Sequence, residues 1–197
     1  MDITTTIKMH NDVKIPQLGF GVFQAHDHVA KQAVLWALEA GYRHIDTAAA
    51  YNNEQAVGDA IRESGLAREE IFVTTKLWND DQRAHRQREA FEESLSKLGL
   101  DYVDLYLIHW PVKDCYLESW QVLETLYAEG KTRSIGVSNF RSHHIEEVLH
   151  AGQVAPHVNQ LEFNPGNQDN DTLAFCREKG IVFEAWSPLG NGKYTSD

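Results

Sequence analysis

The sequence has little of several residue types and patterns that would point to particular protein classes. It contains two cysteines, Cys115 and Cys176, which are too few for a disulfide framework and show no metal-binding spacing. Both are expected to be reduced thiols. No run of residues is apolar and long enough to cross a bilayer, and the N-terminal stretch MDITTTIKMHNDV lacks the apolar segment of a signal peptide. We therefore expect a cytoplasmic protein with no membrane partner.

Positive charge is also scarce. Lysine and arginine number 18 against 29 aspartates and glutamates, which gives a formal net charge of −11. Because binding to nucleic acid requires a basic face, this balance argues against a nucleic-acid partner. The 197 residues are 42 % apolar and 24 % charged, as in an ordinary globular protein, and suffice for one sizeable core but not for two comfortable domains.

Strand-like and helix-like segments alternate along the chain. A hairpin is expected first, over TIKMHNDVKIP, with Asn11 and Asp12 at its turn. The segments that follow are mostly apolar and rich in β-branched or aromatic residues, as parallel strands covered on both faces are. The seven strand candidates are residues 18–23, 42–48, 70–77, 102–110, 133–139, 157–163 and 180–189.

Helix candidates lie between these strands. One carries Phe91, Leu95 and Leu98 on a single face. Each candidate ends at a glycine, the residue that most readily takes the left-handed conformation preferred at a helix C-terminus. The six glycines are Gly41, Gly65, Gly99, Gly130, Gly152 and Gly180. No linker or change of composition interrupts the pattern, so residues 1–197 are interpreted as a single domain.

Repeated strand–helix units with a parallel sheet allow an open doubly wound sheet or a closed (β/α)8 barrel. One polar or aromatic residue stands at the C-terminal end of each of six successive strand candidates: Asp46, Lys76, His109, Ser138, Gln160 and Trp186. A barrel brings these ends together around one pocket. An open dinucleotide-binding sheet would need a glycine fingerprint after its first strand, and GFGVF at 19–23 lacks that spacing. The sequence therefore predicts an α/β protein of the TIM-barrel class.

The count of elements is short for that fold. A complete barrel takes roughly 250 residues, and the seventh helix, eighth strand and eighth helix have no candidate here. We therefore expect a (β/α)8 TIM barrel truncated after about the seventh strand, preceded by the N-terminal β-hairpin. Unpaired edges on its outer strands would invite aggregation, so this chain alone is expected to fold poorly.

Four titratable residues suggest a common chemistry. Asp46, Lys76 and His109 end successive strands, and Tyr51 follows Asp46 by five residues. A buried lysine needs an anion, which Asp46 on the neighbouring strand supplies. A charged lysine lowers the pKa of a nearby phenol from about 10 toward the working range. Tyr51 would then be a general acid, with His109 as a neutral hydrogen-bond donor or proton relay.

Each of these residues also has a purely structural interpretation. Asp46 could cap a strand end, and Tyr51 could be a packed aromatic residue. Lys76 could extend to the surface, and His109 could be a hydrogen-bonded core histidine. Because the four groups occupy three consecutive strand ends and one adjoining loop, the catalytic interpretation is favoured.

A metal site is the competing functional interpretation. His143, His144 and His150 lie in one helix candidate, but no H-E-x-x-H spacing occurs. We therefore expect no metal.

Longer segments carry a resemblance to a known family. From IPQLGFGVF to its last residues the chain resembles the aldo-keto reductases, and within them the bacterial 2,5-diketo-D-gluconate reductases. The segments that carry the resemblance are GYRHIDTAAAYNNEQAVG (41–58), TTKLWN (74–79), YLIHWP (106–111), IGVSNF (135–140), VNQLEFNP (158–165) and AWSPLG (185–190).

The resemblance implies a role for each matching residue. Tyr51 would be the general acid, and the residues completing the family tetrad would be Asp46, Lys76 and His109. The implied cofactor-binding residues are Ser138, Asn139 and Gln160 at the nicotinamide carboxamide, Trp186 stacked on its ring, and Ser187 and Leu189 on the pyrophosphate side. The implied walls of the substrate pocket are Phe23, Trp78 and Trp110.

Several of these roles have alternatives, and two features depart from the family pattern. Trp78 and Trp110 could serve only to pack the barrel rim, and Gln160 could cap a strand end. The family usually has tyrosine or another aromatic residue where Trp186 stands. The family's basic segment for the adenosine 2′-phosphate has no counterpart here, so the resemblance implies NADPH without excluding NADH.

The resulting hypothesis is an NADPH-dependent reductase of small aldehydes or ketones, including dicarbonyls similar to 2,5-diketo-D-gluconate, that is a monomer when complete. The hydride would come from the cofactor and the proton from Tyr51. One alternative is a non-catalytic cofactor-binding or regulatory protein on the same fold, or an inactive fragment. Another is a barrel hydrolase or isomerase, which the missing metal and phosphate-loop patterns disfavour.

Overall fold

The computed structural model describes residues 2–195. It begins with an antiparallel hairpin of β1 (Thr6–Lys8) and β2 (Lys14–Pro16), as predicted, with Asp12 in a left-handed conformation at the turn (φ 67°). The other strands form one parallel sheet in sequential order from β3 to β9. They are β3 (Phe20–Gly21), β4 (His44–Asp46), β5 (Phe72–Leu77), β6 (Leu105–Ile108), β7 (Ile135–Ser138), β8 (Val158–Glu162) and β9 (Val182–Trp186).

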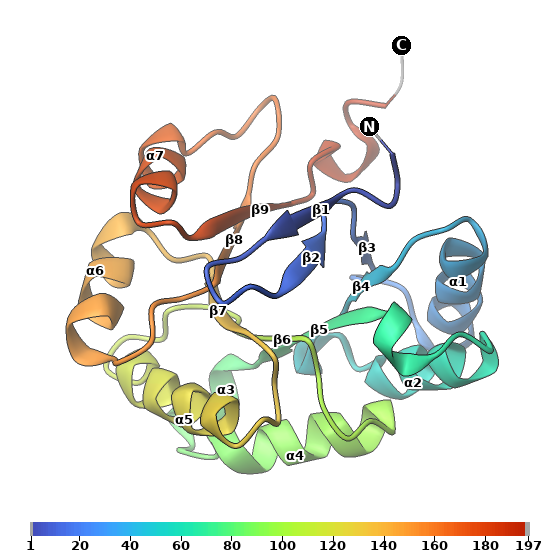
Figure 1. The fold of residues 1–197 in the computed structure, drawn as a ribbon, viewed down its shortest axis with the longest axis horizontal. Coiled ribbons are helices and arrows are strands. Elements are labelled where there is room, and N and C mark those ends of the chain that lie inside the picture. Colours follow the sequence, from blue (N-terminus) through green and yellow to red (C-terminus); the bar gives the residue numbers. More distant parts are fainter. Residues whose placement is uncertain (1, 196–197) are drawn as a thin grey trace.

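Helices connect the strands and cover the outside of the sheet (Figure 1). They are α1 (Asp27–Glu39), α2 (Glu54–Glu63), α3 (Asn79–Arg83), α4 (Gln87–Leu98), α5 (Tyr116–Ala128), α6 (Ser142–Ala151) and α7 (Asn170–Glu178), with short 3-10 turns η1 (Ala49–Tyr51), η2 (Arg68–Glu70) and η3 (Gly190–Gly192). The six predicted helices are present, and α3 is an addition that the sequence did not predict. Within residues 2–195 no helix is long and apolar enough to span a membrane.

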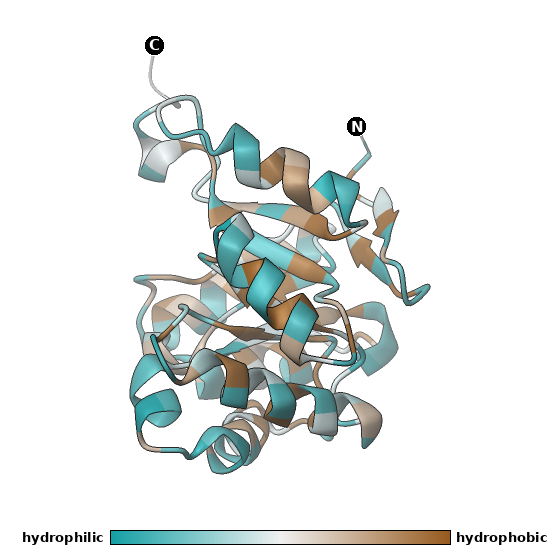
Figure 2. Ribbon diagram, turned by 90° about the vertical axis from the view of Figure 1, so that its left-hand side faces the viewer, coloured by the Kyte–Doolittle hydropathy of each residue, from teal (hydrophilic) through white to brown (hydrophobic). Residues whose placement is uncertain are grey.

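The sheet curls into most of a barrel wall. In the described part of the chain β3 pairs with β4 alone and β9 with β8 alone, so the two outer strands do not join. Figure 1 shows the curl. Figure 2 shows the outer helices striped with hydrophilic and hydrophobic residues, as expected for helices with one face on a sheet. The predicted α/β barrel, incomplete after its seventh parallel strand, is confirmed.

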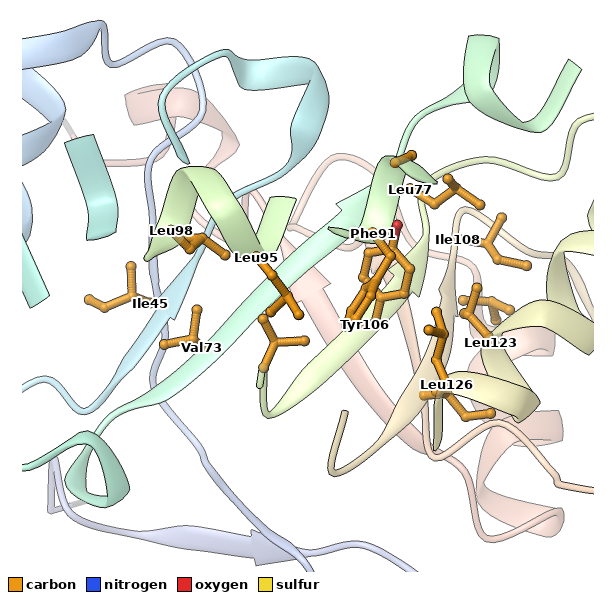
Figure 3. Packing of buried hydrophobic residues seen from close by; sticks show 14 of the residues in the cluster. Ile45, Val73, Leu77, Phe91, Leu95, Leu98, Tyr106, Ile108, Leu123 and Leu126 are labelled. Atoms are coloured by element: carbon orange, nitrogen blue, oxygen red, sulfur yellow. The ribbon is translucent and has the colours of Figure 1, made fainter. Parts of the chain in front are cut away.

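The main core lies between the sheet and its covering helices. In α4, Phe91 packs edge-on against Tyr106 of β6 with ring centroids 4.7 Å apart. Leu95 of the same helix and Val73 of β5 belong to the same buried cluster, and both are labelled in Figure 3. Both strand residues are fully buried. Since burying one large apolar side chain stabilises a fold by about 1.5–3 kcal/mol, this layer fixes the strand order that positions the strand ends.

The hairpin covers the N-terminal end of the barrel. Met9 and Ile15 are buried in a second apolar cluster with residues at the starts of the strands, among them Leu105 and Val158. The Asn11 side-chain amide donates to the Arg133 carbonyl at 3.0 Å. The opposite, C-terminal end is left for polar chemistry.

A buried carboxylate joins the start of β5 to the segments that lead into β6 and β7 at this N-terminal end. Asp104, 1 % exposed, accepts hydrogen bonds from Arg68 Nη2 at 2.7 Å and from Arg133 Nη1 at 2.8 Å. The backbone N–H of Val73 also donates to it, at 2.9 Å. The two guanidinium groups supply the positive charge that a buried carboxylate requires.

Five of the six predicted glycine helix ends have a positive φ, but Gly152 does not. Gly152 has φ −92° and ψ 169°, so the predicted left-handed end is wrong at this position. A Cβ there would lie 2.6 Å from Nε1 of Trp120. Glycine is required at this helix end by close packing rather than by backbone conformation.

Gly58 lies where the backbones of α2 and α4 approach closely, because a Cβ there would lie 2.0 Å from the carbonyl oxygen of Leu98. We expect Gly58→Ala to lower the free energy of unfolding by about 1–3 kcal/mol through overpacking, although alanine is the better helix former. Urea denaturation measures the change. Gly21→Ala is the control, since an added Cβ there meets nothing within 4 Å. Equal effects of the two substitutions would contradict the packing explanation.

Candidate active site

A cavity of about 920 Å³ opens at the C-terminal ends of the strands and continues toward the hairpin. All the predicted site residues line it except Lys76, which lies just behind the wall, and Leu189, which is 58 % exposed on the turn after β9. The barrel therefore brings together residues as far apart in sequence as Phe23 and Ser187.

Lys76 and Asp46 form an ion pair at the floor of the cavity. Lys76 is 1 % exposed, and its Nζ donates to Asp46 Oδ1, to the Thr47 carbonyl at 3.0 Å and to the Tyr51 hydroxyl at 3.5 Å. Burial alone would lower the pKa of Lys76, but the charges of Asp46 and Tyr51 outweigh it and raise that pKa above its ordinary value. Lys76 is therefore a fixed positive charge beside the phenol.

Tyr51 ends η1, and a local hydrogen-bond network holds this turn in place. Asn52 after it is left-handed, with φ 56°. The Asn53 side chain accepts from the Thr47 hydroxyl at 2.7 Å and donates to the Val22 carbonyl at 2.9 Å. These bonds join the turn to the ends of β3 and β4 and hold the phenol over Lys76.

The expected lowering of the Tyr51 pKa is wrong for this structure. Burial raises the pKa of Tyr51, the Lys76 charge lowers it and the Asp46 charge raises it, so that the pKa lies above 10 overall. The lysine does oppose the increase, as predicted, but desolvation of the phenol is the larger effect. Tyr51 therefore keeps its proton throughout the physiological range.

His109 faces the same phenol from the end of β6. Its ring centroid lies 5.6 Å from that of Tyr51 and 5.2 Å from that of Trp78. Burial, together with the Lys76 charge, lowers the pKa of His109 to about 3. The imidazole is therefore neutral at physiological pH, as the sequence predicted, and its buried Nδ1 has no hydrogen-bond partner among the described residues.

The predicted cofactor-side residues form a connected polar wall. Gln160 Nε2 donates to Asp46 Oδ2 at 2.9 Å, which joins this wall to the ion pair. The Asn139 amide donates to the Ser138 hydroxyl at 3.1 Å and accepts from Trp186 Nε1 at 3.0 Å. The indole of Trp186 is thus held in one orientation at the edge of the cavity.

Aromatic side chains form the outer wall. Phe23, 61 % exposed, has its ring centroid 5.1 Å from that of Tyr51. Trp110 is 42 % exposed, and Trp78 packs against His109. The entrance is therefore apolar while the floor is polar, an arrangement typical of a pocket for a small ligand.

Sequence reasoning missed Glu184, which also lines the cavity. It stands two residues before Trp186 on β9 and is paired in register with Gln160 on β8. Alternate residues of a strand share one face, so the position of Trp186 could have indicated that Glu184 points to the same side.

Comparison with known proteins gives the family. A model of the aldo/keto reductase family matches residues 17–197. The chain belongs to the aldo/keto reductase family. It is therefore a member of a family of oxidoreductases, as the resemblance of its segments predicted.

Curated relatives agree with the assignment. The chain is 52 % identical over 188 residues to the 9,11-endoperoxide prostaglandin H2 reductase of Trypanosoma cruzi, covering 95 % of this chain and 66 % of the relative. It is 51 % identical over 189 residues to the glyoxal reductase of Bacillus subtilis, covering 95 % of this chain and 68 % of the relative. The chain thus spans about two thirds of the length of these aldo/keto reductases.

Solved structures of the family share the fold. The aldo/keto reductase of Brucella melitensis superposes with a TM-score of 0.92 at 50 % identity, covering 95 % of this chain and 74 % of that one. The Bombyx mori aldo-keto reductase, solved in complex with NADP, superposes with a TM-score of 0.88 at 42 % identity, covering 95 % of this chain and 67 % of that one.

Proposed function

We propose that this aldo/keto reductase chain carries the site for NADPH-dependent reduction of small uncharged aldehydes and ketones to alcohols. The observation that carries the proposal is the convergence of Asp46, Tyr51, Lys76 and His109 on one cavity with aromatic walls. A protonated phenol beside a fixed cation and a neutral imidazole is suited to giving a proton to a developing alkoxide.

The residues on the polar wall fit a nicotinamide ring. A planar ring needs an aromatic face, which the oriented Trp186 indole offers, and its carboxamide needs hydrogen-bonding groups, which Ser138 and Asn139 offer. No lysine or arginine in residues 2–195 lines the cavity, so the choice of NADPH over NADH rests on the NADP-bound relative. When bound, this cofactor supplies the hydride.

The chain's own residues perform the acid chemistry. The Tyr51 hydroxyl donates its proton to the carbonyl oxygen as that oxygen gains negative charge, and Lys76 stabilises the phenolate left behind. Asp46 holds Lys76 in place through their ion pair. The neutral His109 orients the carbonyl, since one of its ring nitrogens can donate a hydrogen bond.

Charge selects the class of substrate. Asp46 and Glu184 line the cavity, and the cation of Lys76 is committed to Asp46. A substrate carboxylate would meet like charge, and a pair of like charges 4 Å apart costs about 4 kcal/mol at an effective dielectric constant of 20. Neutral carbonyls, including dicarbonyls such as that named for the Bacillus relative, are therefore favoured over keto acids, among them the 2,5-diketo-D-gluconate suggested by the sequence, which carries a carboxylate.

Methylglyoxal and pyruvate test this proposal, because they share a three-carbon skeleton and differ in an aldehyde or a carboxylate. The loss of NADPH absorbance is measured with each at equal concentration. We expect kcat/KM for methylglyoxal to exceed that for pyruvate by at least about tenfold, given the like-charge cost. Equal rates would refute the charge argument. NADPH binding without turnover of either substrate would favour a cofactor-binding protein over a reductase.

A further inference from the structure

A second carboxylate lies beside the ion pair at the cavity floor. Glu184 Oε1 lies 4.0 Å from Nδ1 of the buried His44, and polar atoms of Glu184, His44 and Asp46 all lie within 4.8 Å of one another. Gln160, whose amide donates to Asp46, is the register partner of Glu184. Glu184 Oε2 is shielded from solvent and has no hydrogen-bond partner among the described residues.

The charges around this carboxylate do not balance. The titratable neighbours of Glu184 are His44 and Asp46 on β4, and Asp46 connects it to Lys76 on β5, whose Nζ donates to Asp46 Oδ1. Two carboxylates therefore share the single permanent cation of Lys76, which is hydrogen-bonded to Asp46. Like charges at this separation cannot both ionise freely, so the state of one carboxylate affects the other.

We propose that Glu184 is a positioning residue of this site. Its carboxylate adds a second negative charge near Lys76, and it thereby helps to determine the net charge of the Asp46–Lys76 pair beside the Tyr51 hydroxyl. The assignment rests on the proposed function of the cavity, but its test reads ionisation rather than turnover. Glu184 itself need not touch substrate, because its influence passes through Lys76.

The pKa of Glu184 is shifted in the direction that this geometry predicts. Burial and the Asp46 charge raise the pKa of Glu184, while His44, Gln160 and Lys76 oppose the increase. In return, Glu184 is one of the groups that raise the pKa of Lys76. The influence is therefore mutual, as linkage between two interacting sites requires.

The test is a carboxyl ¹³C NMR titration of the full chain labelled at its glutamate and aspartate side chains. Glu184→Gln identifies the Glu184 resonance by its disappearance. We expect the wild-type midpoint of Glu184 to lie above those of the exposed glutamates. It should move further up in Lys76→Met, which removes the cation, and down in Asp46→Asn, which removes the like charge.

Glu178→Gln is the matched control, because that side chain is 70 % exposed on α7 and should leave the Glu184 midpoint unchanged. A wild-type midpoint equal to those of the exposed glutamates would overturn the proposal, as would the same midpoint in Asp46→Asn. The Asp46→Asn comparison, which preserves side-chain size, decides the matter if Lys76→Met does not fold. Failure of the reductase proposal would show instead as absent turnover with these midpoint shifts intact.

Discussion

Tyr51→Phe is expected to reduce kcat/KM for carbonyl reduction by about a hundred- to ten-thousandfold, the usual contribution of a general acid. Phenylalanine retains the ring that packs against Phe23 and His109 but removes the hydroxyl that lies 3.5 Å from Lys76 Nζ. The affinity for NADPH should change little, because the phenol does not belong to the polar wall assigned to the cofactor. Steady-state kinetics and a fluorescence titration with NADPH measure the two quantities.

The matched control is Tyr42→Phe, which removes a hydroxyl from a half-buried tyrosine outside the cavity. Its kinetics should match those of the unmodified chain. Near-normal turnover in Tyr51→Phe would mean that the proton comes from another donor, and His109 would be the first residue to examine.

Asp104→Ala is expected to cost about 3–5 kcal/mol of folding free energy, as is typical when one partner of a buried ion pair is removed. The substitution leaves Arg68, whose Nη2 is bonded to this carboxylate, and Arg133 without their common anion. It also leaves the Val73 N–H without its acceptor at the start of β5. Urea denaturation followed by circular dichroism measures the loss.

Asp101→Ala, three residues earlier at an exposed position, should change stability by less than about 0.5 kcal/mol. A similarly small effect of Asp104→Ala would show that water replaces the carboxylate at the arginines. The cluster would then contribute little to holding the start of β5 to the segments that lead into β6 and β7.

The strands could be predicted because a parallel sheet covered by helices buries both of its faces, so apolar runs such as that of β5 are visible in the sequence. The helix α3 could not be predicted from the sequence. Its five residues, Asn79–Arg83, have no apolar periodicity, and the helix forms in the loop after β5. The helix end at Gly152 was predicted from the left-handed conformation of glycine. The structure shows that glycine is needed there because a Cβ would lie too close to Trp120.

The candidate site was predictable in its membership but not in its electrostatics. Asp46, Lys76 and His109 could be grouped because each ends a strand and the barrel brings those ends together. The pKa of Tyr51 depends on how deeply the phenol is buried, which no spacing encodes. Glu184 was missed because its segment resembled an ordinary apolar strand, and only Trp186 of that strand was assigned to the site.

The position of the N-terminal hairpin has a consequence for the order of assembly on the ribosome. Each strand of the sheet pairs with its neighbour in sequence, so the sheet can grow as the chain emerges. The hairpin, in contrast, contacts residues much later in the chain: His10 lies against the carbonyl of Pro156, 146 residues later, and Met9 shares a cluster with Leu105 and Val158. Packing of the hairpin can therefore begin once β6 has emerged but is complete only after β8, and until then Met9 and Ile15 lack part of the apolar surface that buries them.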